Sequence, residues 1–304
     1  MGVTRITLIG YGEVGTILAE DLGAAGVRVT AYDCKLDEAA GAGMRAHAAR
    51  HGVLLASGHT NAVADAEIVI SAVTASQTAS VAAACAPTIG GAFYLDFNSA
   101  SPGAKLAASA VIGAAGGRYV EAAVMTSVPP HRIKVPMLLG GPDAAALQSL
   151  IAPLGFATTI VSASIGTASA TKMCRSVMIK GLEALIIESL TTARAHGVEQ
   201  QVLASLKETF PGIDWEVQAA YFFQRVIAHG RRRAEEMYEA AETVRGAGLT
   251  PWSAQGTAER QAWMADLADQ GAFGKRASDA FARSADWRIE ADRILASLTD
   301  PKKR

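Results

Sequence analysis

The sequence predicts an α/β fold, a doubly wound parallel sheet followed by an all-helical region, and three observations carry this prediction. Short β-rich runs alternate with alanine-rich helical stretches from Thr4 to about Ser162, as in βαβ units. A long helical periodicity then begins at Ser169. Charged residues rise from 20 of the first 165 positions to 37 of the remaining 139, as expected for solvated helix faces. We therefore expect two domains, residues 1–165 and 166–304.

Seven strands are expected in the first domain. Several of them carry almost no charge, which is typical of strands that helices cover on both faces of a sheet. They are Thr4–Ile9, Arg28–Asp33, Ile68–Val73, Phe93–Phe97, Arg118–Val124, Pro136–Leu139 and Ala157–Ser162.

Six helices are expected in the second domain. The first has a broad apolar face at helical spacing, and Gly197 follows it as a C-cap. The helices are Ser169–His196, Gln200–Thr209, Asp214–Ala228, Arg231–Arg245, Ser253–Gln270 and Ser278–Ser297.

The composition is that of a folded globular protein. Half of the residues are hydrophobic and 19% are charged, which excludes general disorder. The 28 basic and 29 acidic residues nearly balance, so we expect neither nucleic acid nor a membrane as partner. The uncharged stretch 68–95 is interrupted by polar residues, proline and glycine, and is interpreted as strand, helix and strand rather than a membrane span.

The three cysteines are Cys34, Cys85 and Cys174, and no two of them have CxxC spacing. This pattern indicates neither a disulfide framework nor a zinc cage, so we expect no metal and a reducing, cytoplasmic location. The N-terminal residues contain no targeting segment that we identify.

A glycine-rich motif follows the first expected strand and opens a helical stretch. In GxGxxG the first glycine makes a tight turn, the second lets a pyrophosphate approach the backbone, and the third lets the helix pack closely on the strand. The helix N-terminus adds N–H donors and partial positive charge. This context predicts a Rossmann dinucleotide site. Its expected cofactor-binding residues are Gly10, Tyr11, Gly12, Glu13, Val14 and Gly15.

Asp33 ends the second expected strand, 18 residues after Gly15. An acidic residue there accepts hydrogen bonds from the adenosine ribose and repels a 2′-phosphate, which favours NAD over NADP. Lys35 lies close enough for some tolerance of NADP. The alternative is an ordinary turn and a solvated strand end.

Two later strand ends are also expected to face the cofactor, because dinucleotides bind outside the carboxyl ends of parallel strands. They are Val73-Thr74 and Asn98-Ser99. The alternative role of the second segment is a helix N-cap before Pro102, which suits Ser101 best.

Four motifs in order resemble the β-hydroxyacid dehydrogenase and 6-phosphogluconate dehydrogenase superfamily. After the glycine motif come a D-x-S-T-x-x-P-like loop with Ser99 at the hydroxyl position, a D-A-P-V-S-G-G-like segment, and a G-x-x-x-x-x-K motif that ends at Lys172. These three stretches are 96–102, 121–127 and 166–172. The helical part is similar to a poorly characterised branch. The resemblance implies a homodimer through the helical domain.

Lys172 is the expected general acid/base. Oxidation of an alcohol needs a base that takes the hydroxyl proton while hydride leaves the carbon, so the amine must be neutral beforehand. Burial and the positive nicotinamide ring both disfavour the charged amine. The alternative is a surface lysine near a helix start.

The chain departs from the superfamily pattern around the substrate. Asparagines are common three and four residues after the lysine, where this chain has arginine and serine, and a glutamate used in decarboxylation is replaced by Ile179. The Ser-Gly-Gly segment is replaced by methionine, threonine and serine, so a standard small hydroxyacid is not the expected substrate. The expected substrate-binding residues are Met125, Thr126, Ser127, Arg175 and Ser176.

Two basic groups have open roles. The segment His131–Lys134 is either an anion clamp or a solvated loop. The run Arg231–Arg233 is either a solvated helix face with (i, i+4) ion pairs or an anion or dimer contact.

The expected activity is an NAD-preferring oxidoreductase that moves hydride between nicotinamide and the hydroxyl carbon of an anionic, hydroxyacid-like small molecule. An imine or bulky-ketone reductase is the alternative within the same fold. A dinucleotide-sensing protein without turnover is the alternative outside enzymes, and the lysine motif argues against it because sensing needs no proton acceptor.

Overall fold

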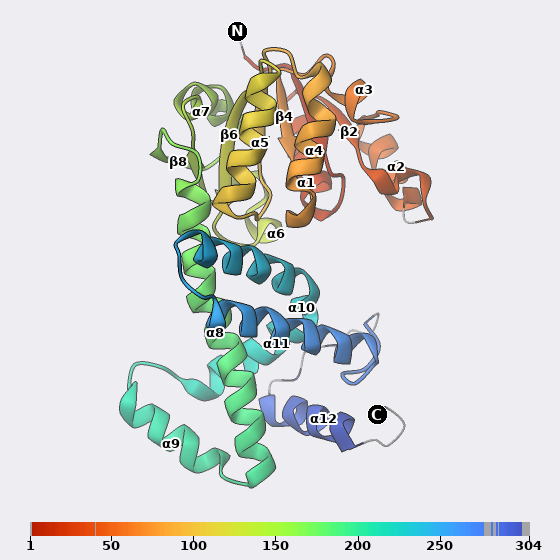
Figure 1. Cartoon of the computed structure of the whole chain (residues 1–304). Helices are drawn as coiled ribbons and strands as arrows, with labels where there is room; N and C mark the ends of the chain where they lie inside the picture. Colours follow the sequence, from red (N-terminus) through yellow and green to blue (C-terminus); the bar gives the residue numbers. More distant parts are fainter. Residues whose placement is uncertain (1, 40, 277–280, 282–283, 285, 300–304) are drawn as a thin grey trace. The chain divides into compact units, whose positions relative to one another are not determined.

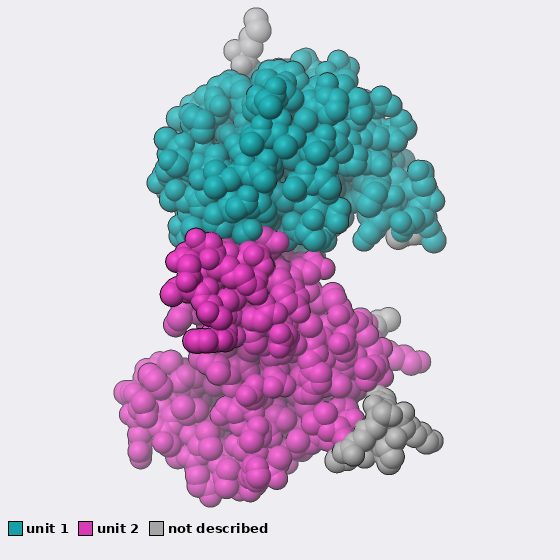
Figure 2. Space-filling view, viewed as in Figure 1, with its two compact units in different colours: residues 1–173 teal, residues 174–304 magenta. Residues whose placement is uncertain are grey.

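The computed structural model of the chain describes residues 2–39, 41–276, 281, 284 and 286–299. The chain forms two compact units, residues 1–173 and 174–304, which Figure 2 colours separately. None of the helices among the described residues is long and apolar enough to cross a membrane.

The first unit contains one sheet of eight strands in the order β3-β2-β1-β4-β5-β6-β7-β8. Figure 1 shows these strands with their covering helices. The strands are β1 (Arg5–Ile9), β2 (Arg28–Tyr32), β3 (Leu54–Leu55), β4 (Ile68–Ser71), β5 (Phe93–Asp96), β6 (Arg118–Val124), β7 (Met137–Gly140) and β8 (Thr158–Ser162). The seven expected strands are therefore present, and the short edge strand β3 was not predicted.

Strand β7 runs antiparallel to β6, whereas the other neighbouring strands are parallel. The predicted doubly wound parallel sheet is confirmed, and the β6–β7 pair is its exception. Only residues 125–136 connect the two strands, and they hold a single helical turn, α6 (Val128–His131), and a short 3₁₀ segment, η4 (Arg132–Lys134). This connection lacks the long helix that a parallel crossover normally uses, so the chain returns in the opposite direction.

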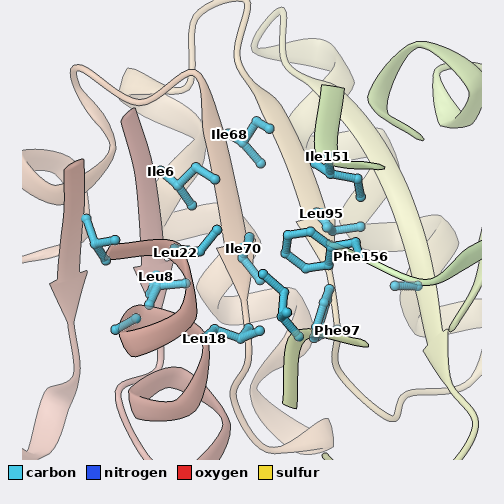
Figure 3. Packing of buried hydrophobic residues seen from close by; sticks show 14 of the residues in the cluster. Ile6, Leu8, Leu18, Leu22, Ile68, Ile70, Leu95, Phe97, Ile151 and Phe156 are labelled. Carbon is cyan, nitrogen blue, oxygen red and sulfur yellow. The ribbon is translucent and has the colours of Figure 1, made fainter. Parts of the chain in front are cut away.

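Helices cover both faces of the sheet because successive strand residues point to opposite sides. Alternate residues such as Leu8 and Ile70 pack with Leu18 and Leu22 of one layer, as Figure 3 shows. Ile9, Val69 and Tyr94 belong to the second buried cluster. The first layer holds α1 (Glu13–Ala24), α2 (Gly41–His51) and α7 (Ala144–Ile151), and the second holds α3 (His59–Val63), α4 (Thr78–Cys85) and α5 (Pro102–Ala114).

The two units divide between residues 173 and 174, eight residues after the predicted boundary between 165 and 166, because helix α8 (Thr167–His196) begins in the first unit. The carboxylate of Glu121 on β6 explains the difference. It accepts the N–H groups of Gly166 and Ala168 at 2.8 and 2.9 Å, and the Ser169 hydroxyl at 2.7 Å. The first turns of α8 are thereby bound to the sheet.

The second unit is all-helical, as predicted. After α8 come α9 (Glu199–Thr209), α10 (Trp215–Gly246), α11 (Trp252–Asp269) and α12 (Trp287–Thr299). The predicted helix 278–297 is described only in part, because 278–280, 282–283 and 285 lie outside the described residues.

The predicted break between residues 228 and 231 was wrong, because α10 is continuous there. Gly230 has another role. A Cβ atom at this position would lie 2.8 Å from the carbonyl oxygen of Gln261 on α11. The glycine therefore allows two helices to approach closely instead of ending one of them.

Candidate active site

The glycine turn lies at the carboxyl end of β1. Gly10 has a φ of +95°, and a Cβ atom there would lie 2.4 Å from the carbonyl oxygen of Ala72. At Gly15 a Cβ atom would lie 2.2 Å from the carbonyl oxygen of Gly10, so the start of α1 packs directly on the turn. A Cβ atom at Gly12 would meet nothing within 4 Å among the described residues. The turn is therefore packed against the protein at Gly10 and Gly15 and open at Gly12, where a ligand would approach.

The start of α1 provides backbone donors to that open side. Gly12 is its N-cap, and no side chain of the described residues caps it. Glu13 is exposed, while Val14 packs against the hydrophobic core. An uncapped helix N-terminus beside a bare glycine is suited to a pyrophosphate. The residues present therefore fit a dinucleotide.

Asp33, just after β2, binds the glycine turn. Its Oδ2 atom accepts the Tyr11 N–H at 2.8 Å, and its Oδ1 atom accepts the Lys35 N–H at 2.9 Å. The carboxylate therefore fixes the loop after β2 to the glycine turn. The Tyr11 phenol is fully buried, and its hydroxyl lies 2.8 Å from Nδ1 of His47. Only the backbone of Tyr11 therefore faces the turn.

Asn98 connects the ends of β4 and β5. Its Oδ1 atom accepts the Val73 N–H at 2.8 Å, and its Nδ2 group donates to the Ser71 hydroxyl at 3.0 Å. The side chain is buried and engaged by the protein, so it positions Val73 in addition to any ligand contact. Thr74, by contrast, is exposed, and its hydroxyl lies 3.5 Å from that of Ser76.

Asn98 also belongs to a buried polar cluster around Asp96, which the sequence analysis did not predict. Asp96 accepts Nζ of Lys105 at 2.8 Å, the Tyr119 hydroxyl at 2.6 Å and the Asn98 N–H at 2.8 Å. Burial, and then the nearby Asp96 charge, raise the pKa of Tyr119 well above its usual value. The neutral phenol therefore remains a donor to Asp96. A carboxylate at a strand end followed nine residues later by a helical lysine was the available signal.

Lys172 reaches the same edge of the sheet. Its Nζ donates to the Ser99 hydroxyl at 2.5 Å, and both side chains are half-buried. Ser99 follows β5, and β4 separates β5 from the β1 strand that carries the glycine turn. Parallel strands place their carboxyl ends at one edge, so the amine and the turn lie at the same edge.

The segment after β6 also ends at this edge. The Met125 N–H donates to the Pro136 carbonyl at 3.0 Å, which fixes the backbone there. Met125 and Ser127 are half-buried, and Thr126 is exposed. The segment therefore offers one exposed hydroxyl, one half-buried hydroxyl and a thioether.

Arg175 and Ser176 lie three and four residues beyond Lys172 on α8, so the helix places all three on one face. Arg175 is exposed. Ser176 is buried and accepts Nζ of Lys180 at 3.0 Å, and that amine pairs with Glu236 at 2.9 Å. Burial lowers the pKa of Lys180, and the Glu236 charge opposes this.

Neither predicted basic group is a simple anion clamp. The Arg132 guanidinium pairs with Glu20 at 2.7 Å and with Asp21 at 2.8 Å, so internal carboxylates occupy it. In the other group, Arg233 is buried and pairs with Glu183, so the expectation of a wholly solvated face was wrong. The other two arginines of the run form exposed ion pairs. Arg231 pairs with Asp266 at 2.7 Å, and Arg232 forms the expected (i, i+4) contact with Glu236 at 3.8 Å.

Two families match parts of the chain. Residues 5–98 match the family described as NADP oxidoreductase coenzyme F420-dependent. Residues 193–264 match a family described only as a domain of unknown function, DUF1932. The first match includes the glycine turn and Asn98, and the second lies in the helical unit.

Two solved structures resemble nearly the whole chain. A conserved hypothetical protein from Sinorhizobium meliloti 1021 is 38% identical over 96% of this chain and 97% of that chain, with a TM-score of 0.74. A conserved protein of unknown function, described as structurally similar to 3-hydroxyacid dehydrogenases, is 28% identical over 87% of this chain and 99% of that chain, with a TM-score of 0.67. The chain belongs to the same family as the Sinorhizobium meliloti protein, and its fold is that of the 3-hydroxyacid dehydrogenases.

Further proteins are similar at lower identity. An uncharacterised 28.5 kDa protein of Methanothermus fervidus is 27% identical over 81% of this chain and 93% of that protein. A Mycobacterium tuberculosis 3-hydroxyisobutyrate dehydrogenase with L-serine is 18% identical over 96% of this chain and 99% of that chain, with a TM-score of 0.65, and shares the fold alone. Fold and matched domains support a nicotinamide-dependent, hydroxyacid dehydrogenase-like oxidoreductase in a poorly characterised branch of proteins with this fold.

Proposed function

We propose that the chain is an NAD-preferring dehydrogenase that oxidises the hydroxyl carbon of an anionic, hydroxyacid-like substrate, with Lys172 as general acid/base. The observation that carries the proposal is the 2.5 Å hydrogen bond between the Lys172 amine and the Ser99 hydroxyl. It brings a proton-transfer group to the sheet edge where the glycine turn is suited to a dinucleotide.

The residues of the chain would divide the work as follows. A bound nicotinamide supplies the hydride acceptor or donor. The neutral Lys172 amine takes the proton from the substrate hydroxyl and returns it in the reverse direction. Ser99 orients that amine, and Glu121 keeps the helix that carries it attached to the sheet. The uncapped start of α1 and Gly12 would hold the pyrophosphate.

The preference for NAD rests on Asp33. Its carboxylate is fixed by two backbone N–H groups, so its charge cannot move far from the end of β2. A fixed negative charge there favours ribose hydroxyls over a 2′-phosphate. The description of the family that matches residues 5–98 names NADP, and this name applies to that family. The cofactor preference of this chain is therefore measured with both reduced cofactors.

Arg175, Thr126 and Ser127 are the groups proposed to bind the substrate anion. Arg175 shares a helix face with Lys172, and a guanidinium binds a carboxylate with two parallel hydrogen bonds. The two hydroxyls follow β6 at the same edge as Ser99. Ser176 contributes less directly, because its hydroxyl already accepts the Lys180 amine.

A second candidate is an imine or bulky-ketone reductase. It is favoured by Met125, whose half-buried thioether stands where the superfamily pattern has a serine before two glycines. A flexible apolar side chain suits a bulkier and less acidic substrate than a small hydroxyacid.

A substrate panel tests the proposal. Hydroxyacids, simple alcohols and imines are each supplied with NAD⁺ or NADP⁺, or with the reduced forms, and absorbance of the reduced nicotinamide is followed. Turnover of an anionic hydroxy compound with NAD⁺ supports the dehydrogenase. Turnover of imines or neutral ketones alone supports the second candidate, and NADH binding without any turnover would favour the sensing role instead.

A homodimer through the helical unit and a cytoplasmic location belong to the same proposal. Met178 and Leu185, about two turns apart on α8, are 73% and 66% exposed, and such exposed large apolar side chains can mark an interface. The exposed thiols of Cys34 and Cys174 suit a reducing compartment. Light scattering after size-exclusion chromatography should give twice the chain mass, and a monomer would contradict the dimer.

A further inference from the structure

Three potential metal ligands converge between α1 and α2, where two of them are half-buried and one is exposed. They are Glu20 on α1 and the pair His47 and His51 on α2, and their ligand atoms all lie within 4.8 Å of one another. Nε2 of His47 lies 2.9 Å from Oε1 of Glu20, and Nε2 of His51 lies 3.9 Å from the same oxygen. Histidines four residues apart share one helix face, so both rings point to this carboxylate.

His47 and Glu20 are each held by a further hydrogen-bond partner. Nδ1 of His47 lies 2.8 Å from the buried Tyr11 hydroxyl, which leaves Nε2 directed at Glu20. The second carboxylate oxygen of Glu20, Oε2, accepts the Arg132 guanidinium at 2.7 Å, which leaves Oε1 for the histidines. Outer partners that orient a histidine and a carboxylate in this way are characteristic of protein metal sites.

The chain adopts a strained backbone to place Arg132. Its φ is +53°, and among the described residues it is the one residue other than glycine with a positive φ. Asp21 holds it there, since its carboxylate accepts both Nε of Arg132 and the Ile133 N–H at 2.9 and 3.0 Å. Such strain persists only where surrounding contacts enforce it, and it gathers at functional sites.

We propose that Glu20, His47 and His51 form a binding site for a divalent transition-metal ion of the zinc class, with water as the fourth ligand. Two imidazole nitrogens and one carboxylate oxygen are a donor set that zinc takes in proteins, at about 2.0 to 2.2 Å from each atom. Tetrahedral ligands at that distance are a little over 3 Å apart. His51 therefore has to move inward, and its ring, which is stacked on that of His47 at an interplanar angle of 25°, has to tilt toward the ion. It is exposed at the end of α2, which gives an ion a path from solvent.

Metal binding would couple this site to the glycine turn through His47 and Tyr11. With the ion on Nε2, His47 carries its proton on Nδ1 and donates it to the Tyr11 hydroxyl, which can accept as well as donate. The Tyr11 N–H is the group that donates to Asp33. The ion would therefore stabilise α1, α2 and the glycine turn together. The hydrogen bond from the Tyr11 N–H to Asp33 would then break less often.

Metal retention tests the proposal directly. The purified chain is stripped with a chelator, equilibrated with Zn²⁺ at micromolar concentration, dialysed, and analysed for bound metal. We expect one Zn²⁺ per chain in the wild type and in the control His196→Gln, which changes an exposed histidine of the helical unit. In His51→Gln we expect affinity to fall by at least about tenfold. One Zn²⁺ per chain at undiminished affinity in His51→Gln, or no stoichiometric binding to the wild type, would overturn the site.

Hydrogen exchange gives a second readout that does not depend on the measured metal content. Zn²⁺ should slow exchange of the Tyr11 amide in the wild type and leave amides of α9 unchanged. The same slowing in His51→Gln, or none in the zinc-loaded wild type, would contradict the proposed geometry. Neither measurement requires dehydrogenase activity, so the outcome is independent of the proposed function.

Discussion

The Lys172 amine donates a 2.5 Å hydrogen bond to the Ser99 hydroxyl, and this contact joins the first turns of α8 to the end of β5. One partner comes from a helix held by the carboxylate of Glu121, and the other from a loop anchored by Asp96 and Asn98. The two attachments fix the position of the Lys172 amine relative to the sheet. The predictions below test that arrangement and the cofactor turn beside it.

Replacing Ser99 by alanine should lower kcat by about 10- to 100-fold, because the hydrogen bond that orients a chargeable amine is worth about 1.5 to 3 kcal/mol. Affinity for NADH should change little if Ser99 acts mainly through Lys172. Ser99→Thr keeps the hydroxyl and should restore most of the rate. Loss of NADH binding with an unchanged kcat would instead place Ser99 in the cofactor site.

Two glycines of one turn should respond oppositely to alanine. Gly10→Ala should unfold the chain at lower denaturant concentration, by about 1 to 3 kcal/mol, because a Cβ atom collides with the Ala72 carbonyl at a positive φ. Gly12→Ala should leave the free energy of unfolding nearly unchanged and weaken NADH binding, because its open side is where the pyrophosphate approaches. Equal stability losses in both, with equal NADH affinity, would refute this division.

Asp33→Asn should raise the affinity for NADPH relative to NADH by about tenfold, because it removes the negative charge while keeping one oxygen that accepts a backbone N–H. Fluorescence titration of both reduced cofactors measures the ratio. The wild type should bind NADH more tightly. A wild type that prefers NADPH would show that Asp33 does not set the specificity.

Tyr119→Phe should cost about 1 to 3 kcal/mol near neutral pH, because Asp96 loses a buried donor. Burial raises the folded-state pKa of Tyr119, so its stabilising effect is complete below pH 10 and is lost as the pH rises above that value, where the unfolded phenol ionises. Urea unfolding of both proteins across this range should show their difference shrinking above pH 10. A constant or growing difference would contradict the assignment.

Element type was predictable wherever one physical signal dominated. Uncharged β-rich runs such as Ile68–Val73 indicated buried strands, and the charge increase after the sheet indicated helices. Strand direction was not predictable for β7, since apolar patterns are the same in parallel and antiparallel strands. The break predicted between residues 228 and 231 is absent, because a glycine that admits a neighbouring helix looks the same in the sequence as one that ends its own helix.

The same limit applies to the sites. The glycine turn could be predicted from local spacing, because it is a local structure, whereas Lys172 was indicated by its resemblance to a superfamily motif. The connection between Asn98 and Val73, and the convergence of Glu20 on His47, join segments 25 and 27 residues apart. Only the packing of the sheet and its helices brings these groups together, so the search for metal ligands by cysteine spacing could not find the histidine pair.

Replacement of Lys172 by methionine, measured together with NADH affinity, tests the central claim most directly. Methionine keeps an unbranched, flexible side chain of similar size and removes the proton acceptor. With the best substrate from the panel, kcat should fall by about 10² to 10⁴-fold while the Kd for NADH stays near that of the wild type. Lys207→Met, which changes an exposed lysine on α9, should behave as the wild type. Undiminished oxidation by Lys172→Met would contradict the assignment of the general base.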